Sequence, residues 1–359
     1  MVDGGKSRYN QIGVSPIYHL PTTIYQLLSI WTEEIHVTKP KIIVTRKWPQ
    51  QVEAALQQEF DVDLNAADMP MTAAGLKAAL GRCDAFCPTV SDSINAEVLS
   101  AEPLRAKIIG SYGVGFNHID LDTAKARGLV VTNTPEVLTD CTADLAMTLM
   151  LMVARRAGEG ERHVRNGQWT GWRPTHMMGT KVTGKVLGLI GFGRIARAMA
   201  HKAHHGFGMK IIFNDPFPPA AEVMGETRAE ARPTVEDVLR EADFVSLHCP
   251  GGKETHHLLN QARLLLMKPG AFLINTARGD VVDPAALVEA LRKGVIAGAG
   301  LDVYEGEPRV PADLIGMENV VLLPHLGSAS METRVAMGMR VLENVRLYFA
   351  GKAPRDRVV

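Results

Sequence analysis

The sequence predicts an α/β protein with two parallel sheets. Short apolar runs alternate with helical patterns along most of the 359 residues, and this alternation is typical of βα units. The series starts at Lys41 and starts again at Val186, which indicates two successive sheets. The length of 359 residues agrees with two domains, since a domain usually takes roughly 100–200 residues.

The first sheet is expected within residues 39–140. Residues 1–38 precede the alternation and are interpreted as an N-terminal extension. The predicted elements are a strand at 41–45, a helix at 50–60, and strands at 83–90, 107–110 and 129–132. A long apolar helix over residues 138–156 follows, and its composition suits a position between two domains.

The second sheet is expected within residues 141–329. Six apolar runs are predicted as its strands, at 186–190, 210–214, 244–247, 271–275, 296–301 and 320–323. A final amphipathic helix is predicted over residues 331–349.

Composition and charge exclude several classes of protein. Lys and Arg total 39, as do Asp and Glu, so the net charge is zero and no nucleic-acid partner is expected. A hydrophobic content of 46% argues against disorder. The longest apolar run, residues 145–154, is too short to span a bilayer, so no membrane partner is expected. Four cysteines without C-x-x-C spacing favour a reducing, cytoplasmic location.

A glycine turn follows the predicted strand at 186–190. The segment Gly191-Phe192-Gly193-Arg194-Ile195-Ala196 has the form G-x-G-x-x-A and leads into a helical pattern. Such a turn lets the backbone approach a pyrophosphate at a helix N-terminus, as in a Rossmann domain. Asp215 ends the next strand, 22 residues after Gly193, where an acid binds the ribose hydroxyls. An acid there repels a 2′-phosphate, so NAD is favoured over NADP.

Three ionisable residues lie at or near the ends of later strands, namely Arg278, Glu307 and His325. Ligands of such sheets bind beyond the carboxyl ends of the strands. Arg can polarise a carbonyl and hold a carboxylate, His can deliver a proton near neutral pH, and a carboxylate can orient that His. Taken singly, each could be a surface or structural residue, but together they point to reduction of a 2-oxo acid.

The sequence resembles the D-isomer-specific 2-hydroxyacid dehydrogenases over about residues 41–350. The resemblance rests on Ile274-Asn275-Thr276-Ala277-Arg278-Gly279, on residues 301–308 (LDVYEGEP) and on residues 324–328 (PHLGS). It implies that Arg278, Glu307 and His325 are catalytic. It also implies a homodimer and a Rossmann domain, residues 141–329, inserted in a flavodoxin-like substrate domain formed by 39–140 and 330–359.

The resemblance also implies binding residues. The substrate carboxylate is expected on backbone N–H groups of the loop that contains Gly113, Val114 and Gly115. Twelve residues are expected to contact the cofactor, NAD: Thr142, Gly191, Gly193, Arg194, Ile195, Asp215, Pro250, Thr255, Thr276, Ala277, Asp302 and Gly327. Among these, Asp302 is expected to contact the nicotinamide carboxamide.

The substrate class is narrowed by comparison within the family. Formate dehydrogenases carry glutamine in place of Glu307, and many phosphoglycerate dehydrogenases carry a regulatory domain after the last helix. Residues 45–49 (TRKWP) and 171–174 (GWRP) are similar to glyoxylate and hydroxypyruvate reductases. A small 2-oxo acid of that type is therefore expected, with Trp48 and Trp172 either at the substrate mouth or in packing.

Two other functions stay open, a D-3-phosphoglycerate dehydrogenase-type enzyme and an NAD-responsive, corepressor-like scaffold. No metal site is expected. His201 and His205 are interpreted as part of a solvated helix face, and His256-His257 as a surface loop.

Overall fold

The computed structural model describes residues 38–217, 220 and 224–359. Residues Pro40–Val359 form one compact unit. The predicted N-terminal extension, apart from residue 38, lies outside the described residues.

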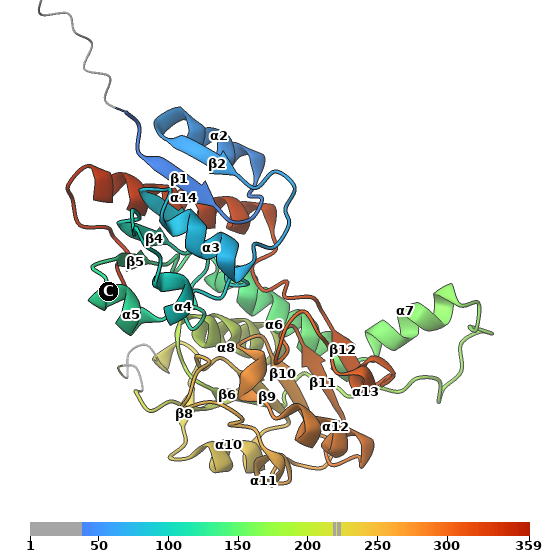
Figure 1. Ribbon diagram of the computed structural model, residues 1–359. Helices are drawn as coiled ribbons and strands as arrows, with labels where there is room; N and C mark the ends of the chain where they lie inside the picture. The colour runs from blue at the N-terminus through green and yellow to red at the C-terminus, as the bar shows by residue number, and fades with distance from the viewer. Residues whose placement is uncertain (1–37, 218–219, 221–223) are drawn as a thin grey trace, which may run out of the picture. The chain divides into compact units, whose positions relative to one another are not determined.

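The first sheet has five parallel strands in the order β2-β1-β3-β4-β5 (Figure 1). This is the doubly wound, flavodoxin-like order. Its strands are β1 (Lys41–Val44), β2 (Asp61–Leu64), β3 (Ala85–Cys87), β4 (Ile108–Gly110) and β5 (Val130–Thr132). Its helices are α2 (Gln50–Glu59), α3 (Ala73–Leu80), α4 (Ala96–Leu99) and α5 (Leu121–Ala126).

Strand β2 was not predicted from the sequence. Its four residues alternate between exposed and half-buried, and two of them are Asp61 and Asp63. Ile42 of β1, whose last three residues are apolar and buried, pairs with Val62 on one side and with Ala85 on the other. This edge strand alternates acidic and apolar residues, so its sequence does not form an apolar run.

The second sheet has seven parallel strands in the order β12-β11-β10-β9-β6-β7-β8. They are β6 (Val186–Ile190), β7 (Lys210–Asn214), β8 (Glu230–Ala231), β9 (Phe244–Leu247), β10 (Phe272–Asn275), β11 (Gly298–Leu301) and β12 (Val320–Leu322). The order is that of a Rossmann sheet with one added strand. The prediction of six strands was wrong by one, because β8 has only two residues and both are exposed.

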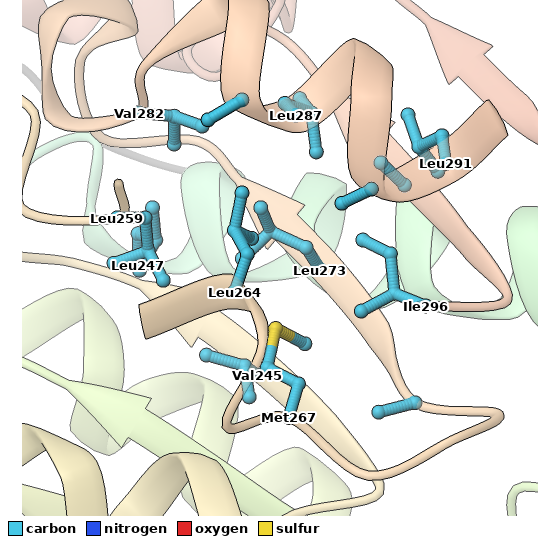
Figure 2. Packing of buried hydrophobic residues seen from close by; sticks show 14 of the residues in the cluster. Val245, Leu247, Leu259, Leu264, Met267, Leu273, Val282, Leu287, Leu291 and Ile296 are labelled. Atoms are coloured by element: carbon cyan, nitrogen blue, oxygen red, sulfur yellow. The ribbon is translucent and has the colours of Figure 1, made fainter. Parts of the chain in front are cut away.

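Helices cover the second sheet and complete its core. They are α8 (Arg194–Phe207), α10 (Val235–Glu241), α11 (Gln261–Leu264), α12 (Pro284–Arg292) and α13 (Ala312–Ile315). Figure 2 shows Leu287 and Leu291 of α12 above Leu273 of β10, which is 0% exposed. Each buried side chain of this kind stabilises the fold by about 1.5–3 kcal/mol. Asp283 caps α12 by accepting hydrogen bonds from Ala285 and Ala286 N–H.

Two long helices connect the sheets. Helix α6 (Thr139–Ala154) follows β5 and lies against β11, where a Cβ on Gly300 would be 3.0 Å from Leu149 Cβ. Helix α14 (Met331–Phe349) follows the second sheet and returns to the first, where Val341 lies over Gly110 of β4. The second sheet is thus inserted between β5 and α14, which confirms the predicted fold class.

Helix α7 (Ala157–Arg165) has no buried residue. It projects from the edge of the second sheet near β12 (Figure 1), and its Arg162 forms an ion pair with Glu318 just before that strand. No helix in the described part of the chain is long and apolar enough to cross a membrane.

Candidate active site

A cleft of about 610 Å³ is lined by residues from both sheets. Ten of the residues singled out from the sequence line it: Gly113, Val114, Thr142, Ile195, Thr276, Arg278, Asp302, Glu307, His325 and Gly327. The strands of each sheet are parallel, so the loops after their carboxyl ends meet at one edge. This is why positions more than 200 residues apart share one cleft.

His325 and Glu307 form a pair in this cleft. His325 Nδ1 lies 2.8 Å from Glu307 Oε2, and Tyr304 N–H donates to Glu307 Oε1 at 2.9 Å. Burial acts to raise the pKa of Glu307, but the hydrogen bond and charge of His325 outweigh it and the pKa is lowered. The carboxylate is therefore held ionised beside the imidazole, and the other ring nitrogen of His325 remains for a substrate.

Asp302 holds the loop that carries His325. The residue is 1% exposed. Its carboxylate accepts hydrogen bonds from Leu326 N–H at 2.6 Å and Gly327 N–H at 2.8 Å. The backbone N–H of His325, whose φ is 57°, donates to Asp302 O at 2.9 Å. Thr142 Oγ1 donates to Gly327 O at 2.9 Å. Burial raises the pKa of Asp302, and both of its carboxylate oxygens have backbone donors.

Arg278 spans the two halves of the cleft. Its Nη1 donates to Ala277 O at 2.7 Å, and its Nε donates to Asn117 Oδ1 at 3.1 Å. Burial lowers the pKa of Arg278, although the charges of Glu307 and Asp280 act in the opposite direction. The guanidinium remains charged at neutral pH.

Gly115 makes room for this arginine. A Cβ at position 115 would lie 1.8 Å from Arg278 Nη2, a separation that two atoms cannot share. The sequence predicted Gly115 for its close approach to an anion, and the structure gives the side chain of Arg278 as a further reason for glycine at this position.

The loop around Val114 also offers free donors. Asn133 Nδ2 donates to Val114 O at 2.8 Å and fixes the loop. Within the described residues, the N–H groups of Val114 and Gly115 have no hydrogen-bond partner. Two such N–H groups near a guanidinium form an anion-binding concavity.

The glycine turn is shaped for a phosphate group. Gly191 has φ 83°, and a Cβ there would lie 2.8 Å from Cys249 N, so a larger residue does not fit. Gly193 precedes α8 without a side-chain cap, and Arg194 and Ile195 begin the helix. Asp215 Oδ2 accepts from Phe192 N–H at 2.6 Å. These residues could hold a dinucleotide, with the helix N-terminus offered to a pyrophosphate and Asp215 to a ribose.

The loops after β9 and β10 contain further predicted residues. Thr255 Oγ1 donates to Pro250 O at 2.6 Å and closes its own loop. Ala277 N–H donates to Asn275 Oδ1 at 3.0 Å. Thr276 Oγ1 is buried without a partner among the described residues, and Thr276 lines the cleft. An orphaned hydroxyl here is available to a bound molecule.

The comparisons with known proteins agree with this geometry. Residues 147–327 match the family model described as D-isomer specific 2-hydroxyacid dehydrogenase, NAD binding domain. A glyoxylate reductase of Thermococcus litoralis is 43% identical over 326 residues, which are 89% of this chain and 97% of that protein. The chain belongs to the D-isomer-specific 2-hydroxyacid dehydrogenase family. It is therefore an oxidoreductase that carries the family's NAD-binding domain.

Further relatives support the assignment over almost the whole chain. A glyoxylate reductase of Pyrococcus horikoshii is 44% identical over 320 residues, 88% of this chain and 95% of that protein. The crystal structure of an NADPH-dependent glyoxylate/hydroxypyruvate reductase from Sinorhizobium meliloti has a TM-score of 0.80 at 33% identity, covering 90% of this chain and 97% of that one. A family member from Polaromonas has a TM-score of 0.83 at 34% identity, covering 90% and 100%.

Several residues of this dehydrogenase's cleft were not found from the sequence. Asn117 and Arg334 were not singled out, although Asn117 holds Arg278 and Arg334 lines the cleft. Arg46 was noticed only as part of a resemblance, and it also lines the cleft. Trp48 is buried in the cleft wall, whereas Trp172 is 82% exposed and is not among the residues lining the cleft.

The remaining predicted residues are not among those that line the cleft. They follow strands of the second sheet or, for Gly115, a strand of the first. These residues are Gly115, Gly191, Gly193, Arg194, Asp215, Pro250, Thr255 and Ala277.

Proposed function

We propose that the protein is an NAD(H)-dependent D-2-hydroxyacid dehydrogenase that reduces a small 2-oxo acid of the glyoxylate or hydroxypyruvate type. The observation that carries the proposal is the pairing of His325 with Glu307 at 2.8 Å in the same cleft as Arg278. A proton donor, its orienting carboxylate and a carbonyl-polarising cation are the groups that this reduction needs. The names of the glyoxylate reductase relatives support the substrate type.

Each group has a defined part in the mechanism. The free N–H groups of Val114 and Gly115 bind the substrate carboxylate, and Arg278 polarises the carbonyl at C2. The bound dinucleotide supplies the hydride. His325 gives its proton to the carbonyl oxygen, and Glu307 stabilises the imidazolium before that transfer. In the direction of oxidation His325 takes the proton back as a base.

NAD is the proposed cofactor because of Asp215. A carboxylate at the end of β7 accepts hydrogen bonds from ribose hydroxyls and repels a 2′-phosphate. The pyrophosphate would lie over Gly191 and Gly193, flanked by the 250–255 loop. Thr276 would offer its unpaired Oγ1 to the part of the cofactor that lies deepest in the cleft.

We propose that the two sheets belong to two domains. Residues 39–140 and 330–359 form the proposed substrate domain, since α14 packs on β4 of the first sheet. Residues 141–329 form the NAD-binding domain. Closure of the two over the cleft would exclude water during the transfer.

We propose further that the enzyme is a cytoplasmic homodimer. The dimer is supported by exposed apolar side chains on α7 and the segment after it. Val164 is 58%, Trp169 56%, Trp172 82% and Met178 67% exposed. Apolar side chains gathered on one projecting element usually mark a contact with a partner. Light scattering of the purified chain should give twice the mass of a single chain.

A phosphorylated 2-oxo acid is the second candidate substrate. Arg46 and Arg334 line the cleft in addition to Arg278, and such cations suit an anionic group at the far end of a substrate. Asp68 already forms an ion pair with Arg46 at 2.9 Å, and this occupied cation argues against a phosphorylated substrate. Steady-state assays with glyoxylate, hydroxypyruvate and phosphohydroxypyruvate, each with NADH and NADPH, will rank the substrates.

The proposed chemistry is tested by His325→Gln. We expect kcat to fall by about 10²–10⁴, the usual contribution of a general acid, while the affinity for NADH, measured by fluorescence titration, stays within twofold. The matched control is His201→Gln, which changes an exposed histidine of α8 and should leave kcat unchanged. Wild-type turnover by the His325 variant would refute the proposed role.

A further inference from the structure

Two adjacent histidines converge on one carboxylate behind the cleft. His256 Nε2 lies 3.2 Å from Glu305 Oε1, and His257 Nε2 lies 3.1 Å from Glu305 Oε2. The two imidazole rings are stacked, with centroids 3.9 Å apart and planes 22° apart. None of the three residues lines the cleft, and the proposed reaction does not use them.

The distances match those of a coordinated metal ion. Zinc binds imidazole nitrogen and carboxylate oxygen at about 2.0–2.2 Å, so tetrahedral ligand atoms lie about 3.3 Å apart. The two nitrogen–oxygen distances here are 3.2 and 3.1 Å, and one ligand atom from each of the three residues lies within 4.8 Å of the others. Small side-chain rotations would therefore bring all three onto one ion.

The backbone holds His257 in place. Its N–H donates to Asp280 O at 2.7 Å, and its φ is 49°, a left-handed conformation that is uncommon outside glycine. The side chains of His256, His257 and Glu305 are 51%, 33% and 35% exposed. The backbone of His257 is thus held in place, and the three side chains remain open to an ion and to water.

We propose that His256, His257 and Glu305 form a binding site for a divalent first-row transition metal ion such as Zn²⁺. Two neutral imidazoles and one carboxylate form a donor set typical of zinc, with water as the fourth ligand. Binding would replace the hydrogen bonds between the histidines and Glu305 with three bonds to the ion.

The site joins two loops of the proposed active site. His256 and His257 directly follow Thr255, whose loop contains Pro250. Glu305 lies two residues before Glu307, the partner of His325. A bound ion would restrain both loops, so we expect it to raise the melting temperature of the protein.

A second histidine cluster provides the control. His201 and His205 lie on α8 with ring centroids 4.5 Å apart, but His205 Nε2 is 3.1 Å from Glu226 O. No carboxylate joins them in a three-ligand group among the described residues. Both clusters contain exposed histidine side chains, so they separate a built site from general affinity of surface histidines.

The experiment uses the full, untagged chain after treatment with a chelator. Calorimetric titration with ZnCl₂ should give one equivalent bound, and the melting temperature should rise. His256→Gln and Glu305→Gln should each weaken binding at least tenfold, while the His201→Gln/His205→Gln double variant binds as the wild type does. Electron paramagnetic resonance with Cu²⁺ should report nitrogen ligands that the His256 variant loses.

Circular dichroism will establish that each variant is folded, and Glu305→Gln retains an acceptor for the histidines. Two results would overturn the proposal. One is unchanged stoichiometry and affinity in both the His256 and the Glu305 variants, and the other is loss of binding only in the α8 double variant. Since the readouts are metal binding and melting temperature, they do not depend on the proposed reaction.

Discussion

Asn117 and Arg278 are joined by a hydrogen bond of 3.1 Å between positions 161 residues apart in the chain. Asn117 belongs to the loop after β4 in the first sheet, and Arg278 follows β10 in the second. The cation proposed to polarise the substrate carbonyl is therefore oriented by the opposite half of the cleft. This hydrogen bond forms only when the two halves lie against each other, so closure of the cleft is expected to orient Arg278 for the proposed reaction.

Replacing Asn117 should impair the use of substrate more than the use of cofactor. Asn117→Ala removes the acceptor of Arg278 Nε, and loss of a hydrogen bond to a charged group costs about 1.5–3 kcal/mol. We expect kcat/KM for the 2-oxo acid to fall about 10–100-fold, with the affinity for NADH unchanged. Asn117→Asp keeps an acceptor and should retain most activity. Equal losses in the two variants would contradict a positioning role.

Gly115 offers a steric test of the same arginine. In Gly115→Ala the new Cβ would lie 1.8 Å from Arg278 Nη2, so the guanidinium must move. A misplacement of about 1 Å costs roughly 10²-fold in rate, and we expect that loss in kcat/KM for the 2-oxo acid. In Gly193→Ala the new Cβ meets no protein atom within 4 Å, but it enters the proposed pyrophosphate site. That variant should raise KM for NADH instead, and the reverse pattern would exclude both assignments.

Local patterns explain which parts of the molecule could be predicted. The strand Val186–Ile190 and the helix Met331–Phe349 have the predicted bounds, because their apolar periodicity is a property of the segment itself. Strands β2 and β8 lie at sheet edges. The residues of β2 are alternately exposed and half-buried and those of β8 are exposed, so neither strand has a continuous apolar sequence.

The residues of the cleft also divide into those that the sequence predicts and those that it does not. Arg278, Glu307 and His325 follow strands of one sheet, and a single topological rule brings them together. Arg334 reaches the cleft because α14 returns to the first sheet, where Tyr112 Oη donates to Arg334 O from a position 222 residues away in the chain. The hydrogen bond between Asn117 and Arg278 depends on how the two sheets lie against each other. No spacing of residues within the sequence predicts that arrangement.

Cofactor preference is expected to depend on Asp215. Asp215→Ser removes the carboxylate proposed to meet the ribose hydroxyls and to repel a 2′-phosphate. We expect kcat/KM with NADH to fall and that with NADPH to rise, so that their ratio changes by at least about tenfold, or 1.4 kcal/mol. Asp215 Oδ2 also accepts from Phe192 N–H and Asp215 Oδ1 accepts from Phe217 N–H, so Asp215→Asn, which keeps one of the two acceptors, is the control for the shape of the turn. A ratio unchanged in the serine variant would show that Asp215 does not discriminate.

His118 should make the stability of the protein depend on pH. Burial, and secondly the charge of Arg278, lower the pKa of His118 to about 4. Its Nε2 lies 3.2 Å from Ser111 Oγ, and its Nδ1 is buried without a partner among the described residues. The unfolded chain, with a histidine pKa of about 6.5, binds the proton more readily than the folded protein. The contribution of neutral His118 to stability is therefore complete above about pH 6.5 and declines as the pH falls toward about 4.

Between pH 7 and pH 5 this decline amounts to about 2 kcal/mol in the free energy of unfolding. His118→Gln cannot take up the proton, so its stability should fall less over the same interval, by about that amount. Urea unfolding of both proteins at the two pH values measures the difference, and the other titrating groups cancel because both proteins share them. Parallel loss of stability in wild type and variant would mean that His118 is protonated in the folded state at pH 5, and that its burial does not lower its pKa.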